Sequence, residues 1–129
     1  HAVVSPMATF GYGVYVGPGT KVAAMACLGN HCSIMANAHI SHDNQLGDFV
    51  YCANSVSISG GVSIGSTTYI GANSTIREYT NIGNRAIIGM GSVVVKDVAD
   101  GQIVVGNPAK PIKNLTNLKL SDGTTGNAK

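Results

Sequence analysis

One periodicity constrains this chain more than any other feature. An apolar residue stands at every sixth position from residue 4 to residue 94, and no insertion interrupts the count. Six residues advance an ideal α-helix by about 600°, so such a stripe would wind around a helix instead of lining one face of it. The pattern therefore excludes a helical fold and favours short strands. The positions are Val4, Phe10, Val16, Val22, Leu28, Ile34, Ile40, Leu46, Cys52, Ile58, Ile64, Ile70, Ile76, Ile82, Ile88 and Val94.

Each hexad also carries small residues at fixed places. The residue two places before the apolar position is small or β-branched, with Asn44 as the one clearly polar exception, and glycine often follows the apolar position. Side chains alternate along a strand, so two residues separated by one point to the same side. We expect the remaining residues to turn a corner, for which glycine has the backbone freedom. Three hexads then complete one triangular coil, which lies about 4.8 Å from the next.

The predicted fold is all-β: a parallel β-helix of hexapeptide repeats with about five coils. We place this domain at residues 1–111, including a short closing strand at residues 101–106 that is turned by Asn107-Pro108, and a polar C-terminal tail at residues 112–129. The length fits a single domain. The repeat itself does not fix the handedness of the coil. The general rule for crossovers favours right-handed connections.

Composition excludes several classes of protein. The net charge of +2 gives no strong reason to expect nucleic acid or a membrane as partner, and no apolar run approaches the roughly 18 residues of a membrane span. The cysteines Cys27, Cys32 and Cys52 lack zinc-type spacing, so we interpret them as reduced thiols of a cytoplasmic protein. Cys32 and Cys52 fall at inward positions, which leaves Cys27 as the one outward thiol.

The stretch "NAHISHDNQLGD" at residues 37–48 concentrates ionisable side chains in an otherwise weakly charged chain. His42 and Asp43 follow the inward Ile40 by two and three places, so we expect them at a corner, with Gly60-Gly61 one coil above. The glycine pair predicts open space above His42. A histidine held by a carboxylate can act as a general base. From these residues alone, a solvated corner histidine remains the alternative.

Four further motifs accompany His42-Asp43: "LGDF" at residues 46–49, "SGGVSIG" at 59–65, "GMGSVV" at 89–94 and "VGNPAK" at 105–110. Together they resemble the hexapeptide-repeat acyltransferases over residues 1 to about 113. More narrowly, they resemble the sugar O- and N-acetyltransferases, which include sialic acid O-acetyltransferases and the acetyltransferases of nucleotide-linked 4-amino sugars. The resemblance implies a left-handed coil.

The resemblance also implies an activity: transfer of an acetyl group from acetyl-CoA to an amine or hydroxyl of a sugar or sugar nucleotide. His42 matches the general base of the family, which is typically worth about 10²–10⁴ in rate, and Asp43 matches the acid that orients it. We expect direct attack on the thioester without an acyl-enzyme. The identity of the acceptor, and whether the product is an amide or an ester, stay open.

Acetyl-CoA contacts can be carried over to three positions. The resemblance places Gly60, Ala72 and Met90 against the donor through backbone N–H groups. Tyr51 stands where relatives often have a second histidine that reaches the acetyl group, and this departure puts that contact in doubt.

Basic residues add an independent indication of where an anionic donor would lie. Seven of the eight lysines and arginines lie beyond residue 76. Lys110 follows the exit turn and is the best candidate for a phosphate contact. Gly71 and Gly89 permit close approach by a pantetheine arm, although corner geometry alone would also explain them. No metal is expected.

The expected oligomer is a homotrimer. A single prism corner is convex, whereas ligands usually need a concave site. The resemblance implies three prisms side by side, with three active sites that are each shared by two chains. Tyr15, Met35 and Tyr69 supply outward apolar groups for such contacts. Relatives in this subgroup usually also carry an N-terminal sugar-binding domain. Nothing before residue 1 supplies it, so we expect either that it is lost or removed, or that the acceptor is smaller.

Two other functions remain as alternatives. A γ-class carbonic anhydrase would need three converging histidines, but His31, His39 and His42 are spaced by eight and three, which does not match the pair five apart in that class. A non-catalytic trimeric module that has lost its sugar-binding domain is the second alternative. Metal analysis tests the first, and stabilisation by acetyl-CoA tests the second.

Overall fold

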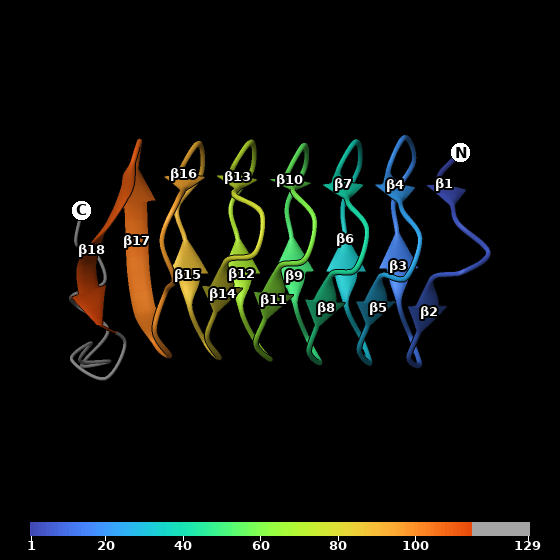
Figure 1. Cartoon of the computed structure of the whole chain (residues 1–129), viewed down its shortest axis with the longest axis horizontal. Coiled ribbons are helices and arrows are strands. Elements are labelled where there is room, and N and C mark those ends of the chain that lie inside the picture. The colour runs from blue at the N-terminus through green and yellow to red at the C-terminus, as the bar shows by residue number, and fades with distance from the viewer. Residues whose placement is uncertain (115–129) are drawn as a thin grey trace, which may run out of the picture.

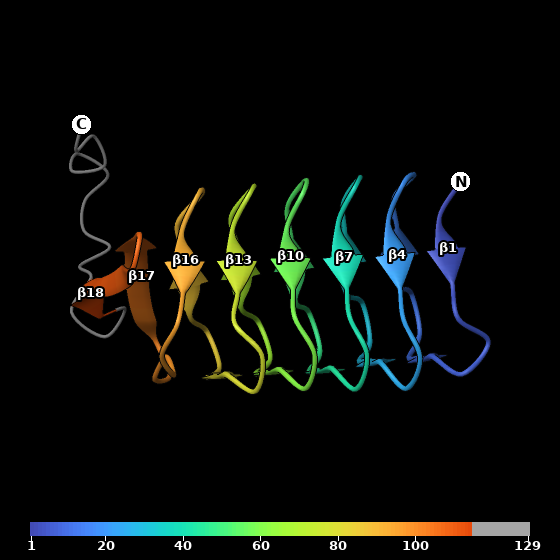
Figure 2. The same ribbon diagram turned by 45° about the horizontal axis from the view of Figure 1, so that its top comes forward.

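The computed structural model describes residues 1–114 and arranges them as a triangular column of stacked coils (Figure 1). Strands recur every six residues and lie on three sheets, one for each side of the triangle. The first sheet contains β1 (Val3–Val4), β4 (Lys21–Val22), β7 (His39–Ile40), β10 (Ser57–Ile58), β13 (Thr75–Ile76) and β16 (Val93–Val94), and its strands form a row in Figure 2.

The other two sheets follow the same order along the column. The second contains β2 (Thr9–Phe10), β5 (Cys27–Leu28), β8 (Gln45–Leu46), β11 (Ser63–Ile64) and β14 (Asn81–Ile82). The third contains β3 (Tyr15–Val16), β6 (Ser33–Ile34), β9 (Tyr51–Cys52), β12 (Tyr69–Ile70), β15 (Ile87–Ile88), β17 (Gln102–Gly106) and β18 (Ala109–Asn114).

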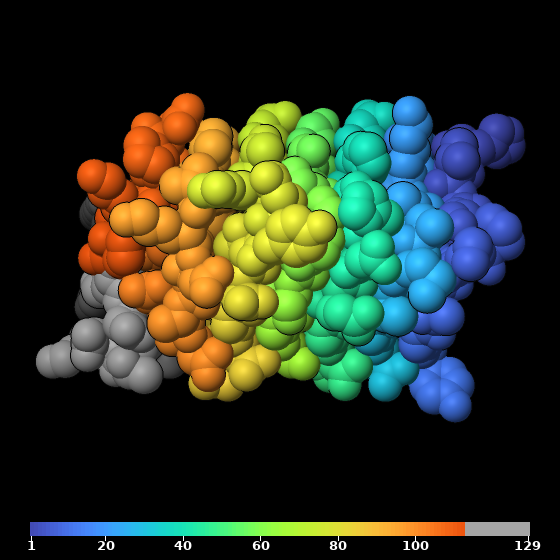
Figure 3. All heavy atoms as spheres, in the orientation of Figure 1, coloured from blue at the N-terminus to red at the C-terminus, as the bar shows by residue number. Residues whose placement is uncertain are grey.

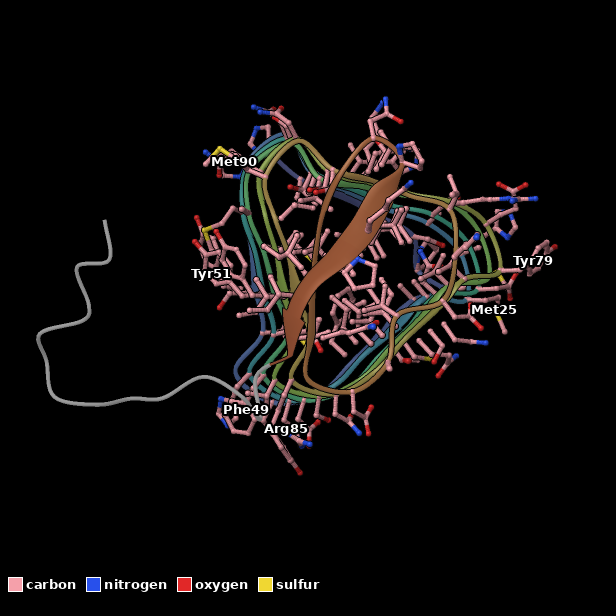
Figure 4. All side chains as sticks on the ribbon, turned by 90° about the vertical axis from the view of Figure 1, so that its left-hand side faces the viewer. Met25, Phe49, Tyr51, Tyr79, Arg85 and Met90 are labelled. Atoms are coloured by element: carbon pink, nitrogen blue, oxygen red, sulfur yellow. The ribbon has the colours of Figure 1, made fainter. Side chains whose placement is uncertain are left out.

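The register confirms the predicted coil. His39 pairs in parallel with Lys21 on the coil before and with Ser57 on the coil after, each eighteen residues away. Each coil packs directly on the next, so the turns form adjoining bands on the surface (Figure 3). Figure 4 looks along the column from its C-terminal end, and Tyr79, Arg85 and Met90 follow one another clockwise while the chain advances towards the viewer. The coil is therefore left-handed, as the resemblance implied.

The number of coils differs from the expected five. The first sheet has six strands, and a sixth turn is completed by an Ile82–Val98 bridge on the second side and by β17 on the third. This last turn is shorter, because Ile82 aligns with Val98 and Ile87 with Ile103, each sixteen residues apart. The six-residue period breaks after Val94 because this turn contains sixteen residues instead of eighteen, although the coil itself continues.

The core consists of the inward residues of successive coils. Seven isoleucines are fully buried, and burying each contributes about 1.5–3 kcal/mol relative to leaving it exposed. The small inward slot is buried as predicted. Stacked branched aliphatics fill the narrow interior, which explains why so few aromatic residues are needed. The isoleucines are Ile34, Ile40, Ile58, Ile64, Ile70, Ile76 and Ile88.

The glycines that directly follow the apolar positions do not hold the left-handed conformation that turns the corners, contrary to the expectation from the sequence, whereas Gly13, Gly19, Gly61 and Gly91 do. Ten non-glycine residues, Asp43 and Asn73 among them, hold the left-handed backbone conformation at the corners. A Cβ on Gly71 would instead lie 2.6 Å from the backbone nitrogen of Met90 on the next coil. Because neighbouring coils are only about 4.8 Å apart, glycine is needed there for close approach between coils.

The three edges of the triangle are named here by one residue each. They are the His42 edge (residues 6–7, 24–25, 42–43, 60–61 and 78–79), the Asp48 edge (12–13, 30–31, 48–49, 66–67 and 84–85) and the Met90 edge (18–19, 36–37, 54–55, 72–73 and 90–91).

At the C-terminal end, β17 turns back into the antiparallel β18, which continues to Asn114 beyond the boundary placed at residue 111. The remainder of the expected tail lies outside the described residues. Residues 1–114 contain no helix, and so none with the length and apolar character needed to cross a bilayer.

Candidate active site

His42 and Asp43 form a side-chain pair on the His42 edge, where the chain passes from β7 to β8. His42 Nδ1 lies 3.0 Å from Asp43 Oδ2, and the two side chains are 58% and 61% exposed. The backbone fixes both residues, since Asp43 N–H donates to the carbonyl of Ala24 and the carbonyl of His42 accepts from Gly61 N–H. An Nδ1 proton donated to the carboxylate leaves Nε2 free to accept a proton, which is the arrangement of a general base.

The space above His42 is not open, contrary to the expectation from the sequence. The imidazole ring itself fills the space next to Gly60, where a Cβ would be 2.5 Å from Cε1 and 2.6 Å from Nε2. The ring of Tyr79, which belongs to the next coil towards the C-terminus, fills the space next to Gly61, with Cδ1 2.6 Å from the position of a Cβ. The glycine pair thus accommodates two rings that approach it from opposite directions.

The Asp48 edge is closed by a ladder of side chains. Each first corner residue there uses its side-chain oxygen to accept the backbone N–H of the residue one coil before it. Asp48 Oδ1 accepts from Asn30 N–H at 2.8 Å, and Ser66 Oγ accepts from Asp48 N–H at 3.1 Å. Asn30, Asn84 and Asp100 complete the series. Asp48 therefore has a structural role, although it belongs to the same acidic stretch as His42.

The other two edges lack such a ladder. Within residues 1–114, the backbone N–H groups of Gly60, Ala72 and Met90 have no hydrogen-bond partner. These are the three positions at which backbone contacts to acetyl-CoA were expected. Unpaired backbone donors normally find water or a ligand. The His42 and Met90 edges can therefore donate hydrogen bonds to the oxygens of a bound molecule through N–H groups that are already paired on the Asp48 edge.

A single chain does not bring all the residues expected to contact acetyl-CoA close to His42. Gly60 lies against its ring, but Ala72 and Met90 belong to the Met90 edge, across the first sheet, and Gly71 and Gly89 directly precede that edge in the chain. Figure 4 shows Met90 at one corner of the triangle and Tyr79, of the His42 edge, at another.

Tyr51 faces outward from the third sheet, between the Asp48 and Met90 edges (Figure 4). Its ring stacks on that of Tyr69, with centroids 5.4 Å apart and planes 12° apart. Tyr51 is thus not on the His42 edge of its own chain.

Lys110 lies on β18 at the C-terminal end of the column. It lines a hollow of about 580 Å³ together with Lys96, Asp97 and Gln102. His42 does not line this hollow, which is several coils away along the column.

The remaining histidines are dispersed. His31 stacks on Phe49 at 5.3 Å on the Asp48 edge, and His39 is exposed on the first sheet. In the part of the chain that the structure describes, no three histidine, cysteine or acidic side chains gather as a metal-ligand set.

The thiols occupy the expected places. Cys32 and Cys52 are buried, and burial raises the pKa of both, which keeps them protonated. Cys27 is partly exposed and accepts a hydrogen bond from the Thr9 hydroxyl at 3.1 Å.

Two features of the edges were not predicted from the sequence. The Asp48-edge ladder could have been found from Asn30, Asp48, Ser66 and Asn84, which recur every eighteen residues. Tyr79 could have been found because it stands eighteen residues after Gly61.

Comparison with known proteins gives consistent results. No protein-family model matches the chain. A curated acyl-[acyl-carrier-protein]–UDP-N-acetylglucosamine O-acyltransferase from Pseudomonas putida (strain W619) is 35% identical over 99 residues, which cover 76% of this chain and 38% of the relative. The chain thus spans well under half of that relative.

Solved structures superpose closely. PerB from Caulobacter crescentus, in complex with CoA and GDP-perosamine, has a TM-score of 0.86 and 34% identity over 87% of this chain and 54% of its own. The acetyltransferase domain of PglB from Neisseria gonorrhoeae, in complex with acetyl coenzyme A, has a TM-score of 0.85 and 36% identity over 86% and 54%.

The fold of this chain thus superposes on the two solved structures over 87% and 86% of its length. The chain belongs to the hexapeptide-repeat β-helix acyltransferase family.

Proposed function

We propose that this protein transfers an acetyl group from acetyl-CoA to the amine of a nucleotide-linked sugar. The observation that carries the proposal is the His42–Asp43 pair at 3.0 Å, exposed on an edge beside the unpaired N–H of Gly60. The relatives give further support, since PerB is described with CoA and GDP-perosamine and the PglB domain with acetyl coenzyme A.

The reaction uses His42 as general base and Asp43 as the residue that positions it. The sugar nitrogen attacks the thioester carbonyl carbon, His42 Nε2 takes the proton from nitrogen, the carbon–sulfur bond breaks, and the CoA thiolate takes that proton from the imidazolium. A base of this kind contributes about 10²–10⁴ in rate. The unpaired N–H of Gly60 stabilises the oxyanion that forms on the carbonyl oxygen. The buried, protonated Cys32 and Cys52 favour direct attack over an acyl-enzyme.

The donor lies along the column, with its thioester at His42 and its phosphates towards Lys110. Gly60, Ala72 and Met90 bind it through N–H groups, and Gly71 and Gly89, which carry no side chain, border the path of the pantetheine arm. Tyr51 takes the place of the relatives' second histidine and donates its hydroxyl hydrogen near the acetyl group.

A homotrimer brings these residues together. The site needs the His42 edge of one chain and the Met90 edge of its neighbour, because one chain holds them on separate edges. The third sheet supports such packing, since it presents outward the apolar Tyr15, Met35, Tyr51 and Tyr69, whereas the first two sheets present mostly polar side chains. A cytoplasmic location agrees with the donor and with cysteines that are all unpaired.

The test is a thiol-release assay with acetyl-CoA and GDP-perosamine, combined with light scattering and a melting curve in acetyl-CoA. We expect a trimer that is stabilised by acetyl-CoA, with turnover that His42→Ala lowers about 10²–10⁴-fold while acetyl-CoA binding persists. Cys27→Ser serves as the control and should leave turnover unchanged. Wild-type protein that neither binds acetyl-CoA nor turns over, an active monomer, or activity lost in Cys27→Ser but kept in His42→Ala would each refute the corresponding part of the proposal.

A further inference from the structure

Tyr79 is a large, exposed ring that neither the core nor the proposed chemistry has used. It follows β13 on the His42 edge, the residue is 75% exposed, and its backbone holds the left-handed conformation at φ 58°. The ring leans over Gly61 towards the N-terminal coils, into space that any side chain on Gly61 would fill. Tyr79 N–H donates to the carbonyl of Gly60 at 3.0 Å, so the backbone of Tyr79 is fixed to the residue under the His42 ring.

The position of Tyr79 along the column places it on the donor side of His42. Lys110 lies at the C-terminal end, and the coil that carries Tyr79 lies between that end and the coil of His42 (Figure 1). A molecule that extends along this edge from Lys110 to His42 must pass the coil of Tyr79.

Met90 lies at nearly the same height on the Met90 edge. Tyr79 and Met90 belong to one eighteen-residue coil, so they differ in height by less than about 4.8 Å. Met90 is 80% exposed, which makes both side chains large apolar groups that project from their edges. In a trimer whose axis runs parallel to the columns, every chain keeps the same heights, and Tyr79 of one chain then stands opposite Met90 of the next.

We infer that Tyr79 is a binding residue for the acyl donor, holding the pantetheine arm near the thioester between its ring and Met90 of the neighbouring chain. This inference rests on the proposed function and adds a residue to it. An aromatic face and a flexible thioether side chain both suit a slender, partly apolar arm. The aromatic face makes the proposed contact, so phenylalanine should serve at this position as well as tyrosine.

The test compares Tyr79→Asn with Tyr79→Phe. Asparagine removes the ring and tolerates the left-handed backbone, whereas phenylalanine keeps the ring. We expect Y79N to raise the KM and Kd for acetyl-CoA about fivefold to tenfold, with kcat and the KM for GDP-perosamine within twofold of wild type, and we expect Y79F to behave as wild type.

Phe49→Asn is the matched control. Phe49 is also an exposed aromatic residue with a left-handed backbone, at φ 57°, but it lies on the Asp48 edge. F49N should leave acetyl-CoA binding unchanged, and thermal melting checks that both asparagine variants fold.

The possible outcomes separate this inference from the proposed function. If wild-type protein binds acetyl-CoA and Y79N binds it equally well, or if Y79N raises only the KM for GDP-perosamine, the role of Tyr79 is refuted and the acetyltransferase proposal stands. If F49N weakens acetyl-CoA binding as much as Y79N, the effect is not specific to the His42 edge and the inference is likewise refuted. If the wild type binds no acetyl-CoA, both fall together.

Discussion

The imidazole ring of His42 lies directly over Gly60, whose missing side chain leaves the space that the ring occupies. A Cβ at this position would come within 2.5 Å of Cε1. The position of the proposed base is therefore set by the residue eighteen places further along the chain, on the next coil.

Replacing Gly60 with alanine should displace the ring and leave the fold intact. Gly60 is not among the residues with a left-handed backbone, so alanine fits the main chain, and the ring can swing into solvent. We expect kcat to fall about 10²-fold, as is typical of a displaced catalytic group, with little change in melting temperature. In a double-mutant cycle, G60A should cause no further loss once His42 is alanine. A G60A enzyme with wild-type kcat would contradict this account.

Asp43 offers a test of the positioning role. Asparagine keeps the size of the side chain and tolerates the φ of 57°, whereas alanine would add backbone strain of about 1 kcal/mol. We expect Asp43→Asn to lower kcat by about 10-fold or more with unchanged stability, because the amide no longer holds the Nδ1 proton. Steady-state kinetics and urea unfolding of D43N and D43A measure the two effects separately. Equal kcat in D43N and wild type would show that the carboxylate is dispensable.

Asn44 directly follows the pair in the chain, is buried, and has only one of its two side-chain polar atoms satisfied. Its Oδ1 accepts from Val62 N–H at 2.7 Å, but its Nδ2 has no partner among residues 1–114. Thr68 occupies the corresponding slot on another side and uses its hydroxyl fully, accepting from Ala86 N–H and donating to the carbonyl of Gly83.

Asn44→Thr should therefore stabilise the protein. The hydroxyl can accept from Val62 N–H and donate to the carbonyl of Ser59, which removes an unsatisfied amide at a gain of about 1 kcal/mol in the free energy of unfolding. Asn44→Asp should instead lower that free energy by about 3 kcal/mol or more at neutral pH, since it buries a charge. Urea unfolding measures both, and a destabilised N44T would mean that the free Nδ2 is satisfied by an internal water.

The buried thiol of Cys52 predicts a dependence of stability on pH. Burial raises the pKa of this thiol in the folded protein, so its contribution is fully present below the pKa of the unfolded thiol, near pH 8.5, and is lost as the pH rises further. Between about pH 9.5 and 11 the free energy of unfolding should fall by about 1.4 kcal/mol per pH unit from this group. Cys52→Ala should have a shallower slope, and parallel slopes for the two proteins would contradict the prediction.

The sequence by itself determined the coil. Each inward residue from Val4 to Val94 occupies the same place in its six-residue repeat, and stacking the coils buries all of these residues together. The period therefore specified the sheets, the register and the corner position of His42. The sequence also indicated that His42 pairs with Asp43, because residues adjacent in the chain at one corner lie close together in any arrangement of the coils. The expected role was wrong only for the glycines that directly follow the apolar positions, since the close approach between coils that they allow depends on residues about eighteen places apart.

Only the tertiary structure decided what lies beside His42. The ring over Gly60, the approach of Tyr79 and the ladder that closes the Asp48 edge all depend on side-chain directions across coils, which a period of six does not encode. The shortened last turn was hidden for the same reason, because Val98 aligns with Ile82 in space although it is out of step in sequence. A repeat fixes where each residue stands along the column, whereas contacts between side chains on different coils are settled only when the coils are stacked.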